Sequence, residues 1–153
     1  MGEQITCNER FFMSTIGYAY VVADILHIGH LKHLRACRGL CDKLIVGVLT
    51  DGATMDKKPK PIISFGERLE IVKNIKSVDV VVKQEDYAPH NNIKQLQPDV
   101  MFESTSHSEE LINKTREVAE GVGARTIVMP YFSGQSSTRI KEKVLKNFRG
   151  NNP

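Results

Sequence analysis

Two histidines follow the first apolar run of the chain at a spacing suited to one face of a helix. The segment "YVVADILHIGH" places His27 and His30 three residues apart around Gly29. Side chains three apart are neighbours on a helix surface, and glycine leaves room where a ligand must approach closely. A helix start adds unpaired N–H groups and a partial positive charge. These groups together suit phosphate oxygens, although an isolated pair of this kind is more often a surface or capping pair.

A second candidate phosphate site lies near the C-terminal end of the sequence. In "SSTRIK" the hydroxyls of Ser136, Ser137 and Thr138 precede a helical pattern and are suited to capping it. The N–H groups of that helix start are again free to meet an anion. Arg139 and Lys141 add positive charge nearby. Alone, such a cluster is usually an ordinary helix cap.

A lysine-rich loop lies between these two motifs. "DKKPKP" carries Lys57, Lys58 and Lys60 on a segment stiffened by proline, which suits closure over a polyanion, although most charged loops are simply solvated. No serine, histidine and aspartate arrangement predicts a covalent nucleophile, and the sequence lacks a G-x-G-x-x-G motif. The chemistry favoured is the binding and neutralisation of a polyphosphate.

The cysteines give little support for a metal site. The chain has three, and Cys37 and Cys41 stand four apart in a predicted helix with His33 beside them. A zinc site at these residues lacks paired ligand clusters at a recognised spacing. We therefore predict no protein-held metal and interpret the cysteines as reduced helix residues.

The apolar periodicity alternates between strand and helix five times. Strand patterns cover 13–24, 43–51, 78–83, 98–103 and 124–131, and helical patterns cover 30–41, 64–75, 90–97, 108–123 and 136–148. Ser64, with Glu67 three residues on, forms a capping box that predicts one helix start. The alternation predicts an α/β fold, a Rossmann-like, doubly wound, five-stranded parallel sheet with helices on both faces. Because ligands bind beyond the carboxyl ends of such strands, we expect the loops after the first, second, fourth and fifth strands to form one crevice.

The totals favour one domain over residues 1–153, with 146–153 as a loose tail. The net charge of +3 is too small and too scattered to indicate a nucleic-acid partner. No apolar run approaches the roughly 18 residues of a membrane span, and the first residues lack the pattern of a signal peptide. We therefore expect a cytoplasmic protein without nucleic-acid or membrane partners.

The motifs resemble a known family of enzymes. "HIGH" and "SSTRIK" resemble the paired HxGH and SSTxIK signatures of the nucleotidyltransferases. The blocks "CDKLIVGVLTD", "KKPKPIISFGERLEIVKNIKSVDVVV" and "LQPDVMF" resemble, in order, those of cytidylyltransferases that act on small phosphorylated alcohols. The likeness extends from about Gly17 to Lys146. It implies attack of an acceptor's phosphoryl oxygen on the α-phosphorus of a nucleoside triphosphate, with release of pyrophosphate and with Mg²⁺ accompanying the triphosphate.

The resemblance also implies roles for individual residues. His27 and His30 would contact the triphosphate and stabilise the transition state, Lys57 or a neighbouring lysine would come from a mobile loop, and Arg68 would be catalytic. The residues implied in nucleotide binding are Val22, Ala23, Asp24, Gly29, Ser136, Ser137 and Thr138. Catalysis would depend on alignment and on neutralisation of charge.

Some residues differ from the family pattern at positions that the resemblance assigns to recognition of the acceptor. Glu103 and Ser104 replace a basic residue and a glycine after the fourth strand, and Tyr131 replaces an arginine. We expect Glu103 and Tyr131 to bind the acceptor. The segment "VADILHIGH" resembles the variant in cytidylyltransferase domains linked to phosphonate metabolism.

The resemblance favours CTP as donor and a small phosphonate or phosphomonoester as acceptor, with a hydroxyalkylphosphonate as the leading choice. It also implies a homodimer. Three alternatives stay open: an adenylyltransferase of the same superfamily, a nucleotide-binding module without catalysis, and a catalytic domain within a larger assembly.

Overall fold

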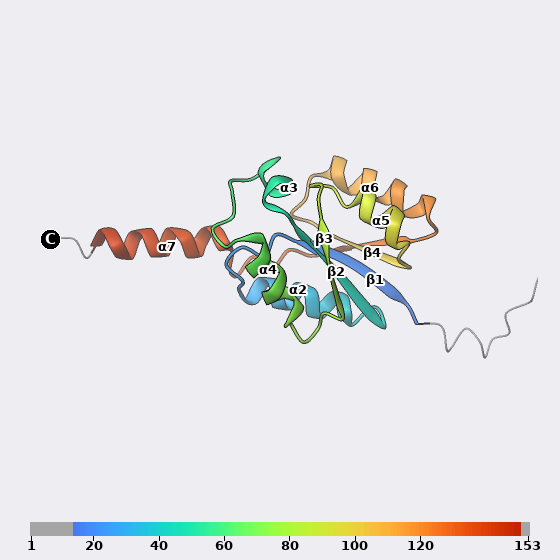
Figure 1. The fold of residues 1–153 in the computed structure, drawn as a ribbon, viewed down its shortest axis with the longest axis horizontal. Coiled ribbons are helices and arrows are strands. Elements are labelled where there is room, and N and C mark those ends of the chain that lie inside the picture. The colour runs from blue at the N-terminus through green and yellow to red at the C-terminus, as the bar shows by residue number, and fades with distance from the viewer. Residues whose placement is uncertain (1–13, 151–153) are drawn as a thin grey trace, which may run out of the picture.

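A parallel sheet of five strands forms the centre of the computed structural model, which describes residues 14–150 (Figure 1). The strands are β1 (Ile16–Val21), β2 (Lys43–Leu49), β3 (Val80–Gln84), β4 (Val100–Ser104) and β5 (Arg125–Met129). Their order is β3-β2-β1-β4-β5, and every neighbouring pair is parallel. This confirms the predicted Rossmann-like α/β fold.

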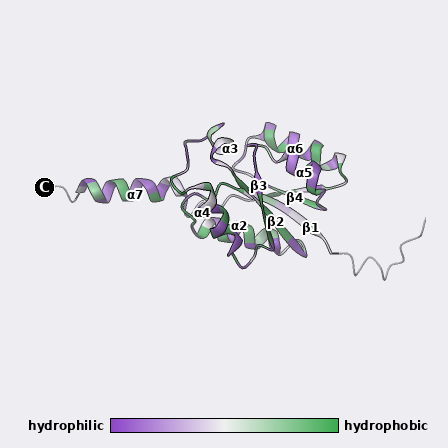
Figure 2. Cartoon of the chain, viewed as in Figure 1, coloured by the Kyte–Doolittle hydropathy of each residue, from purple (hydrophilic) through white to green (hydrophobic). Residues whose placement is uncertain are grey.

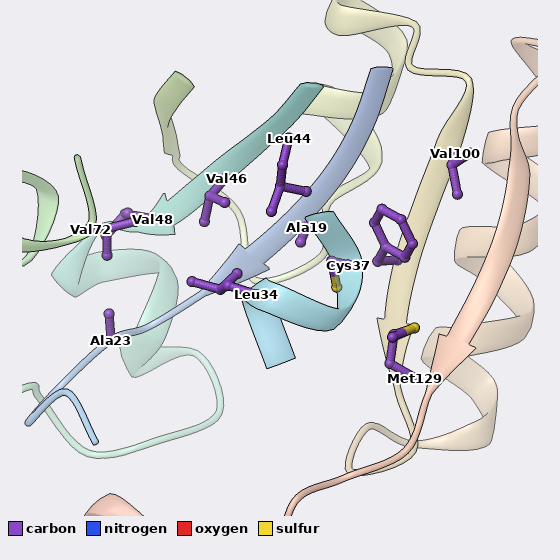
Figure 3. Packing of buried hydrophobic residues seen from close by; sticks show 11 residues of the cluster. Ala19, Ala23, Leu34, Cys37, Leu44, Val46, Val48, Val72, Val100 and Met129 are labelled. Atoms are coloured by element: carbon purple, nitrogen blue, oxygen red, sulfur yellow. The ribbon is translucent and has the colours of Figure 1, made fainter. Parts of the chain in front are cut away.

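Helices cover both faces of the sheet (Figure 1). α2 (Ile28–Arg38) and α4 (Phe65–Lys73) contribute Leu34, Cys37 and Val72 to one buried cluster, shown in Figure 3. α3 (Asp51–Met55), α5 (His90–Leu96) and α6 (Glu109–Gly121) contribute to the second cluster, for example through Ile93 and Ala119. The doubly wound arrangement is therefore also a division of the core into two layers.

Successive residues of β1 supply both layers, because strand side chains alternate between faces. Ala19 belongs to the cluster under α2 and α4, whereas Tyr18 and Tyr20 belong to the cluster under α5 and α6. All three are buried. Burial on both faces explains the nearly continuous apolar runs in the sequence.

The crevice opens where β1 and β4 part. These strands pair only through Gly17 with Val100 and Tyr18 with Met101, although β1 continues to Val21 and β4 to Ser104. The connections from the two strands lead to opposite faces, since α2 and α6 pack in different layers. Their carboxyl ends thus form the switch point at which ligands bind in open α/β sheets.

The capping box predicted at Ser64 is confirmed. The Ser64 hydroxyl accepts a hydrogen bond from the Glu67 N–H, and the Glu67 carboxylate accepts one from the Ser64 N–H. These reciprocal bonds satisfy two N–H groups that the helix start leaves unpaired.

Two segments differ from the sequence-based expectation. Residues 52–55, expected as loop, form the short helix α3 together with Asp51, which was expected to end the second strand; the Thr50 hydroxyl caps the start of the helix. α7 (Ser137–Gly150) continues through 146–150, where we expected a loose tail, because no glycine or proline interrupts the helix before Gly150. Residues 151–153 lie outside the described residues. Figure 1 shows α7 projecting away from the sheet, and Figure 2 shows hydrophobic and hydrophilic residues alternating along it.

None of the described helices has the length and apolar character needed to cross a membrane.

Candidate active site

A cleft of about 780 Å³ lies at the carboxyl ends of the strands. The loops that follow β1, β2, β4 and β5 all line it, as Asp24, Lys58, Ser106 and Tyr131 illustrate. The predicted convergence of these four segments is therefore confirmed. Tyr87, after β3, adds a fifth segment that the sequence had not indicated.

His27 and His30 cap the start of α2 reciprocally. The N–H of Gly29 donates to Nδ1 of His27 over 3.0 Å, and the N–H of His27 donates to Nδ1 of His30 over 3.2 Å. An Nδ1 that accepts a hydrogen bond carries no proton, so the neutral ring carries its proton on Nε2. Both rings line the cleft, with centroids 4.1 Å apart. The helix start is thus an arrangement that fixes two ring N–H donors.

Burial keeps these rings neutral. It lowers the pKa of His27, and it lowers the pKa of His30 to about 4, with a further contribution from the nearby charges of His27, His33 and Lys58. At neutral pH each ring therefore offers a neutral Nε2–H donor. Gly29 is required at this position, since an added Cβ would lie 2.7 Å from Cε1 of His27.

Asp24 closes the turn after β1 and ties two other segments to it. Its carboxylate accepts hydrogen bonds from the N–H groups of Ile62 and Ile63 and lies 2.9 Å from Nζ of Lys141. Burial raises the pKa of Asp24, but the hydrogen bonds from Ile63, Lys141 and Ile62 outweigh it and lower the pKa below its usual value. Asp24 is therefore an ionised anchor that joins β1, the lysine loop and α7.

The turn around Asp24 is strained. Ala23 and Ile25 have φ angles of 57° and 51°, which non-glycine residues rarely adopt, least of all a β-branched one. Val22 lines the cleft as predicted for a nucleotide-binding residue, whereas Ala23 is fully buried and does not line it. Strain of this kind persists where the surrounding contacts hold it, and it is common at functional sites.

Ser136, just before α7, and Ser137, its first residue, hold the first turn of the helix over the same cleft. The Ser136 hydroxyl accepts from the N–H of Arg139 over 3.1 Å, and the Ser137 hydroxyl donates to the carbonyl of Asp24. Ser136, Ser137 and Thr138 all line the cleft, as does Lys141. A second helix start, with its free N–H groups, therefore faces the space that His27 and His30 border.

The lysine loop lines the cleft, but not through Lys57, the lysine named first in the prediction. All three lysines are exposed, and Lys58 and Lys60 line the cleft whereas Lys57 does not. The cleft walls desolvate the Lys58 ammonium and lower its pKa. The neighbour Lys58, rather than Lys57, is thus the lysine beside His30.

Arg68 lies behind the cleft and does not line it. Its side chain is fully buried and donates to the carbonyls of Ile63, Val22 and Leu49 and to the carboxylate of Asp51. A buried guanidinium is tolerated because each of its three nitrogens donates to an acceptor, one of them the Asp51 carboxylate. In this structure Arg68 joins the ends of β1 and β2 to α3 and α4. Its catalytic role stays a prediction.

The two residues predicted to bind the acceptor occupy different places. Tyr131 is 52% exposed at the rim of the cleft. The Glu103 side chain is fully buried and does not line the cleft, because Tyr20 and His107 cover it. Tyr20, His107 and His33 also line the cleft. None of them was among the predicted catalytic or binding residues, and His33 was considered only as a zinc ligand. The only signal for His107 was its place in the polar segment after the fourth strand.

The cysteine cluster behaves as part of the core. Burial raises the pKa of Cys37 to about 12, and its sulfur lies 3.8 Å from Nε2 of His33. A thiol that keeps its proton is a poor zinc ligand, since the thiolate is the form that binds metals. Within residues 14–150 no group of three or more His, Cys, Asp or Glu is arranged to hold a metal ion.

The fold and this cleft are consistent with the nucleotidyltransferase superfamily. The model of the cytidylyltransferase-like family matches residues 19–143, and the chain belongs to that family. Among curated relatives, the bifunctional protein HldE of Citrifermentans bemidjiense is 35% identical over 127 residues, which make up 82% of this chain and 26% of the relative. The HldE protein of Trichlorobacter lovleyi is 33% identical over 147 residues, 95% of this chain and 30% of the relative. The chain thus spans only about a quarter of the length of these relatives.

The fold is also found among solved structures. The lipopolysaccharide core biosynthesis protein of Thermoplasma volcanium superposes with a TM-score of 0.69 at 21% identity. The match covers 80% of this chain and the whole of the other.

Proposed function

We propose that this chain is a nucleotidyltransferase that transfers a nucleoside monophosphate from a nucleoside triphosphate to a small phosphorylated acceptor. The observation that carries the proposal is the pair of Nε2–H donors of His27 and His30, fixed by backbone caps, in the cleft that the first turn of α7 also lines. Such an arrangement suits a chain of phosphates. Membership of the family supports the same class of reaction.

The reaction needs alignment rather than a strong base. An oxygen of the acceptor phosphate forms a bond to the α-phosphorus while the bond from that phosphorus to the bridging oxygen breaks, and pyrophosphate leaves with the bond electrons. A phosphate's second pKa is about 6, so the attacking group is already anionic at neutral pH. The two histidine N–H donors and the Lys58 and Lys60 ammonium groups neutralise charge that develops on the phosphate oxygens.

Mg²⁺ fits this cleft as an ion that accompanies the triphosphate. Mg²⁺ usually binds substrate phosphates, waters and one or two carboxylates rather than a cage made only of protein. Asp24 is the ionised carboxylate of the cleft, and both of its oxygens already accept hydrogen bonds. The ion would supply neutralisation of the phosphate charge, and the chain's own residues would orient the phosphates.

We propose ATP as the first candidate for the donor. The relationship to the bifunctional protein HldE favours the adenylyltransferase alternative over a CTP-dependent enzyme. Transfer of CMP from CTP to a small phosphonate is the second candidate, favoured by the likeness of "VADILHIGH" to phosphonate-linked cytidylyltransferase domains and by the cytidylyltransferase-like family model.

A pyrophosphate-release assay tests both candidates. The purified chain is incubated with Mg²⁺ and each of ATP, CTP, GTP and UTP, against sugar phosphates, glycerol phosphates and small phosphonates. We expect release with ATP and one acceptor class. Release restricted to CTP and phosphonates would favour the second candidate, and nucleotide binding without release would favour a non-catalytic module.

A further inference from the structure

Glu103, Tyr20 and His107 form a polar cluster at the carboxyl ends of β4 and β1, and the reaction outlined above assigns it no role. The two oxygens of the buried Glu103 carboxylate lie 3.0 and 3.1 Å from the Tyr20 hydroxyl. Nδ1 of His107, in the turn after β4, lies 2.5 Å from Oε2 of Glu103 and 3.1 Å from the same hydroxyl. The His107 ring stacks on Tyr20 with centroids 5.2 Å apart. The imidazole of His107 is therefore fixed at its Nδ1 edge by Glu103 and the Tyr20 hydroxyl, and on one face by the Tyr20 ring.

These contacts place the proton of His107. So short a contact between a carboxylate oxygen and a ring nitrogen requires a proton between them. An ionised carboxylate can only accept hydrogen bonds, so beside the Glu103 carboxylate the proton of the short contact lies on Nδ1 of His107, and the Tyr20 hydroxyl donates to the same carboxylate. A carboxylate commonly fixes the tautomer of a histidine in this way. Nε2 of the neutral ring then carries a lone pair.

The free edge of the ring belongs to the cleft. His107 lines the cleft, whereas Glu103, which holds its Nδ1 edge, does not. Among the described residues Nε2 of His107 has no hydrogen-bond partner. His107 is thus the opposite of His27 and His30, whose Nδ1 atoms accept backbone N–H groups and whose Nε2 atoms carry protons. One cleft contains two histidines fixed as donors and one fixed as an acceptor.

We propose that His107 determines acceptor specificity by accepting a hydrogen bond at Nε2 from a hydroxyl group of the acceptor, with Glu103 as its positioning residue. This inference rests on the proposed function, since it assigns this part of the cleft to the acceptor. The neighbouring cleft residues Ser104, Ser106 and Tyr87 add neutral hydroxyls, and the loop after β4 contributes no lysine or arginine to the lining. That wall suits a neutral, hydrogen-donating group rather than a second anion.

The tautomer is tested first and without any substrate. Nitrogen-15 NMR of histidine-labelled protein at pH 8 reports which ring nitrogens carry protons. We expect His107 to be protonated on Nδ1 alone and His27 and His30 on Nε2 alone. Glu103→Gln removes the charge that holds the proton, so the Nε2–H form of His107 should gain population. Wild-type His107 with a proton on Nε2 would overturn the proposal.

The role of His107 in acceptor specificity is tested with two variants, whose amide groups take the place of different ring nitrogens. In His107→Asn the amide reaches the position of Nδ1 and leaves nothing at Nε2, whereas in His107→Gln it reaches the position of Nε2. The probes are 2-hydroxyethylphosphonate and ethylphosphonate, which differ by one hydroxyl, titrated in the presence of a non-hydrolysable nucleotide analogue. We expect wild type and His107→Gln to prefer the hydroxylated probe by about tenfold, as for one hydrogen bond to a buried partner, and His107→Asn to show no preference. No preference in wild type, or a preference retained in His107→Asn, would overturn the proposal.

The two proposals fail separately. If pyrophosphate is released while His107 carries its proton on Nε2, the proposed role of His107 in acceptor specificity is wrong, and the proposed transferase function is supported. If no donor and acceptor pair releases pyrophosphate while tautomer and probe preference are as expected, the transferase function falls and the binding role of His107 stands.

Discussion

At the scale of single residues, the positions of the imidazole protons decide which hydrogen bonds the cleft histidines can form with a ligand. His27 and His30 receive backbone N–H groups at Nδ1, so that burial and capping together fix their Nε2–H groups as neutral donors. The same contacts give His30 a structural task in addition to its proposed catalytic one. Both tasks can be measured separately.

Replacement of His30 by alanine removes a donor to the triphosphate and one member of the cap. We expect kcat to fall by roughly 10² to 10³, the range for loss of a preorganised donor, and the free energy of unfolding to fall by about 1 kcal/mol through the lost cap. Steady-state kinetics and urea unfolding measure the two effects. Turnover close to that of wild type would contradict the assigned role.

The pKa of His30 predicts how stability depends on pH. The folded chain keeps His30 neutral down to about pH 4, whereas the unfolded chain protonates it near 6.5. The unfolded state therefore binds more protons between these values, and the free energy of unfolding should decrease as the pH falls from about 6.5 to 4. In His30→Gln this decrease should be smaller by about 2 kcal/mol. Identical pH profiles for the two proteins in chemical unfolding would contradict the neutral, capped ring.

At the scale of elements, Arg68 joins the strand ends that border the cleft. One buried guanidinium donates to carbonyls at the ends of β1 and β2, to the start of α4 and to Asp51 of α3. The sequence indicated that Arg68 mattered through its family motif. It could not show that the residue acts on the backbone, because that depends on three segments meeting in space.

Arg68→Met, which keeps the length of the side chain, should lower the free energy of unfolding by roughly 3 kcal/mol or more, because buried acceptors lose their donor. Arg68→Lys keeps the positive charge but lacks the several N–H donors of the guanidinium, so its free energy of unfolding should lie between those of the wild type and Arg68→Met. Thermal and urea unfolding measure these losses, and kinetics on the folded fraction should show less than a tenfold change in kcat. Unchanged stability together with a large loss of kcat would instead indicate contact with the reacting groups.

Much of the element order was predictable, and the reasons differ from place to place. Apolar periodicity placed all five strands and the helices α2, α4, α5, α6 and α7, because both-face burial and the Ser64 capping box leave clear patterns. α3 was missed because five residues are too few to show a helical period. His107 and Tyr20 were missed as site residues because their role depends on Glu103, which lies on a strand that pairs only partly with β1.

At the scale of the whole molecule, α7 is the least covered element. Its first turn is bound to the cleft through Ser137 and Lys141, while Val144, Leu145 and Phe148 are 48%, 56% and 74% exposed. These side chains fall on one side of the helix, since their spacing is close to one turn. An amphipathic helix with an uncovered apolar side is a candidate contact between subunits.

The expected homodimer can be tested through this helix. Sedimentation equilibrium should give twice the mass of one chain for wild type, and Phe148→Asp should shift the equilibrium towards monomer, because a charge on the apolar side is costly to bury. Asn147→Asp places the same charge on the neighbouring residue and should leave the mass unchanged. A monomer at all concentrations for wild type would contradict the dimer.

Phosphorus-31 NMR of the complete reaction tests the central claim most directly. With Mg²⁺, a nucleoside triphosphate and the acceptor found by the release assay, we predict two sets of new resonances: inorganic pyrophosphate, and a coupled pair from a product in which the α-phosphorus is joined to the acceptor phosphoryl group. Both should form about a hundredfold or more slowly in His30→Ala. The appearance of nucleoside diphosphate instead would mean attack at the γ-phosphorus, and it would contradict the assignment of this cleft to nucleotidyl transfer.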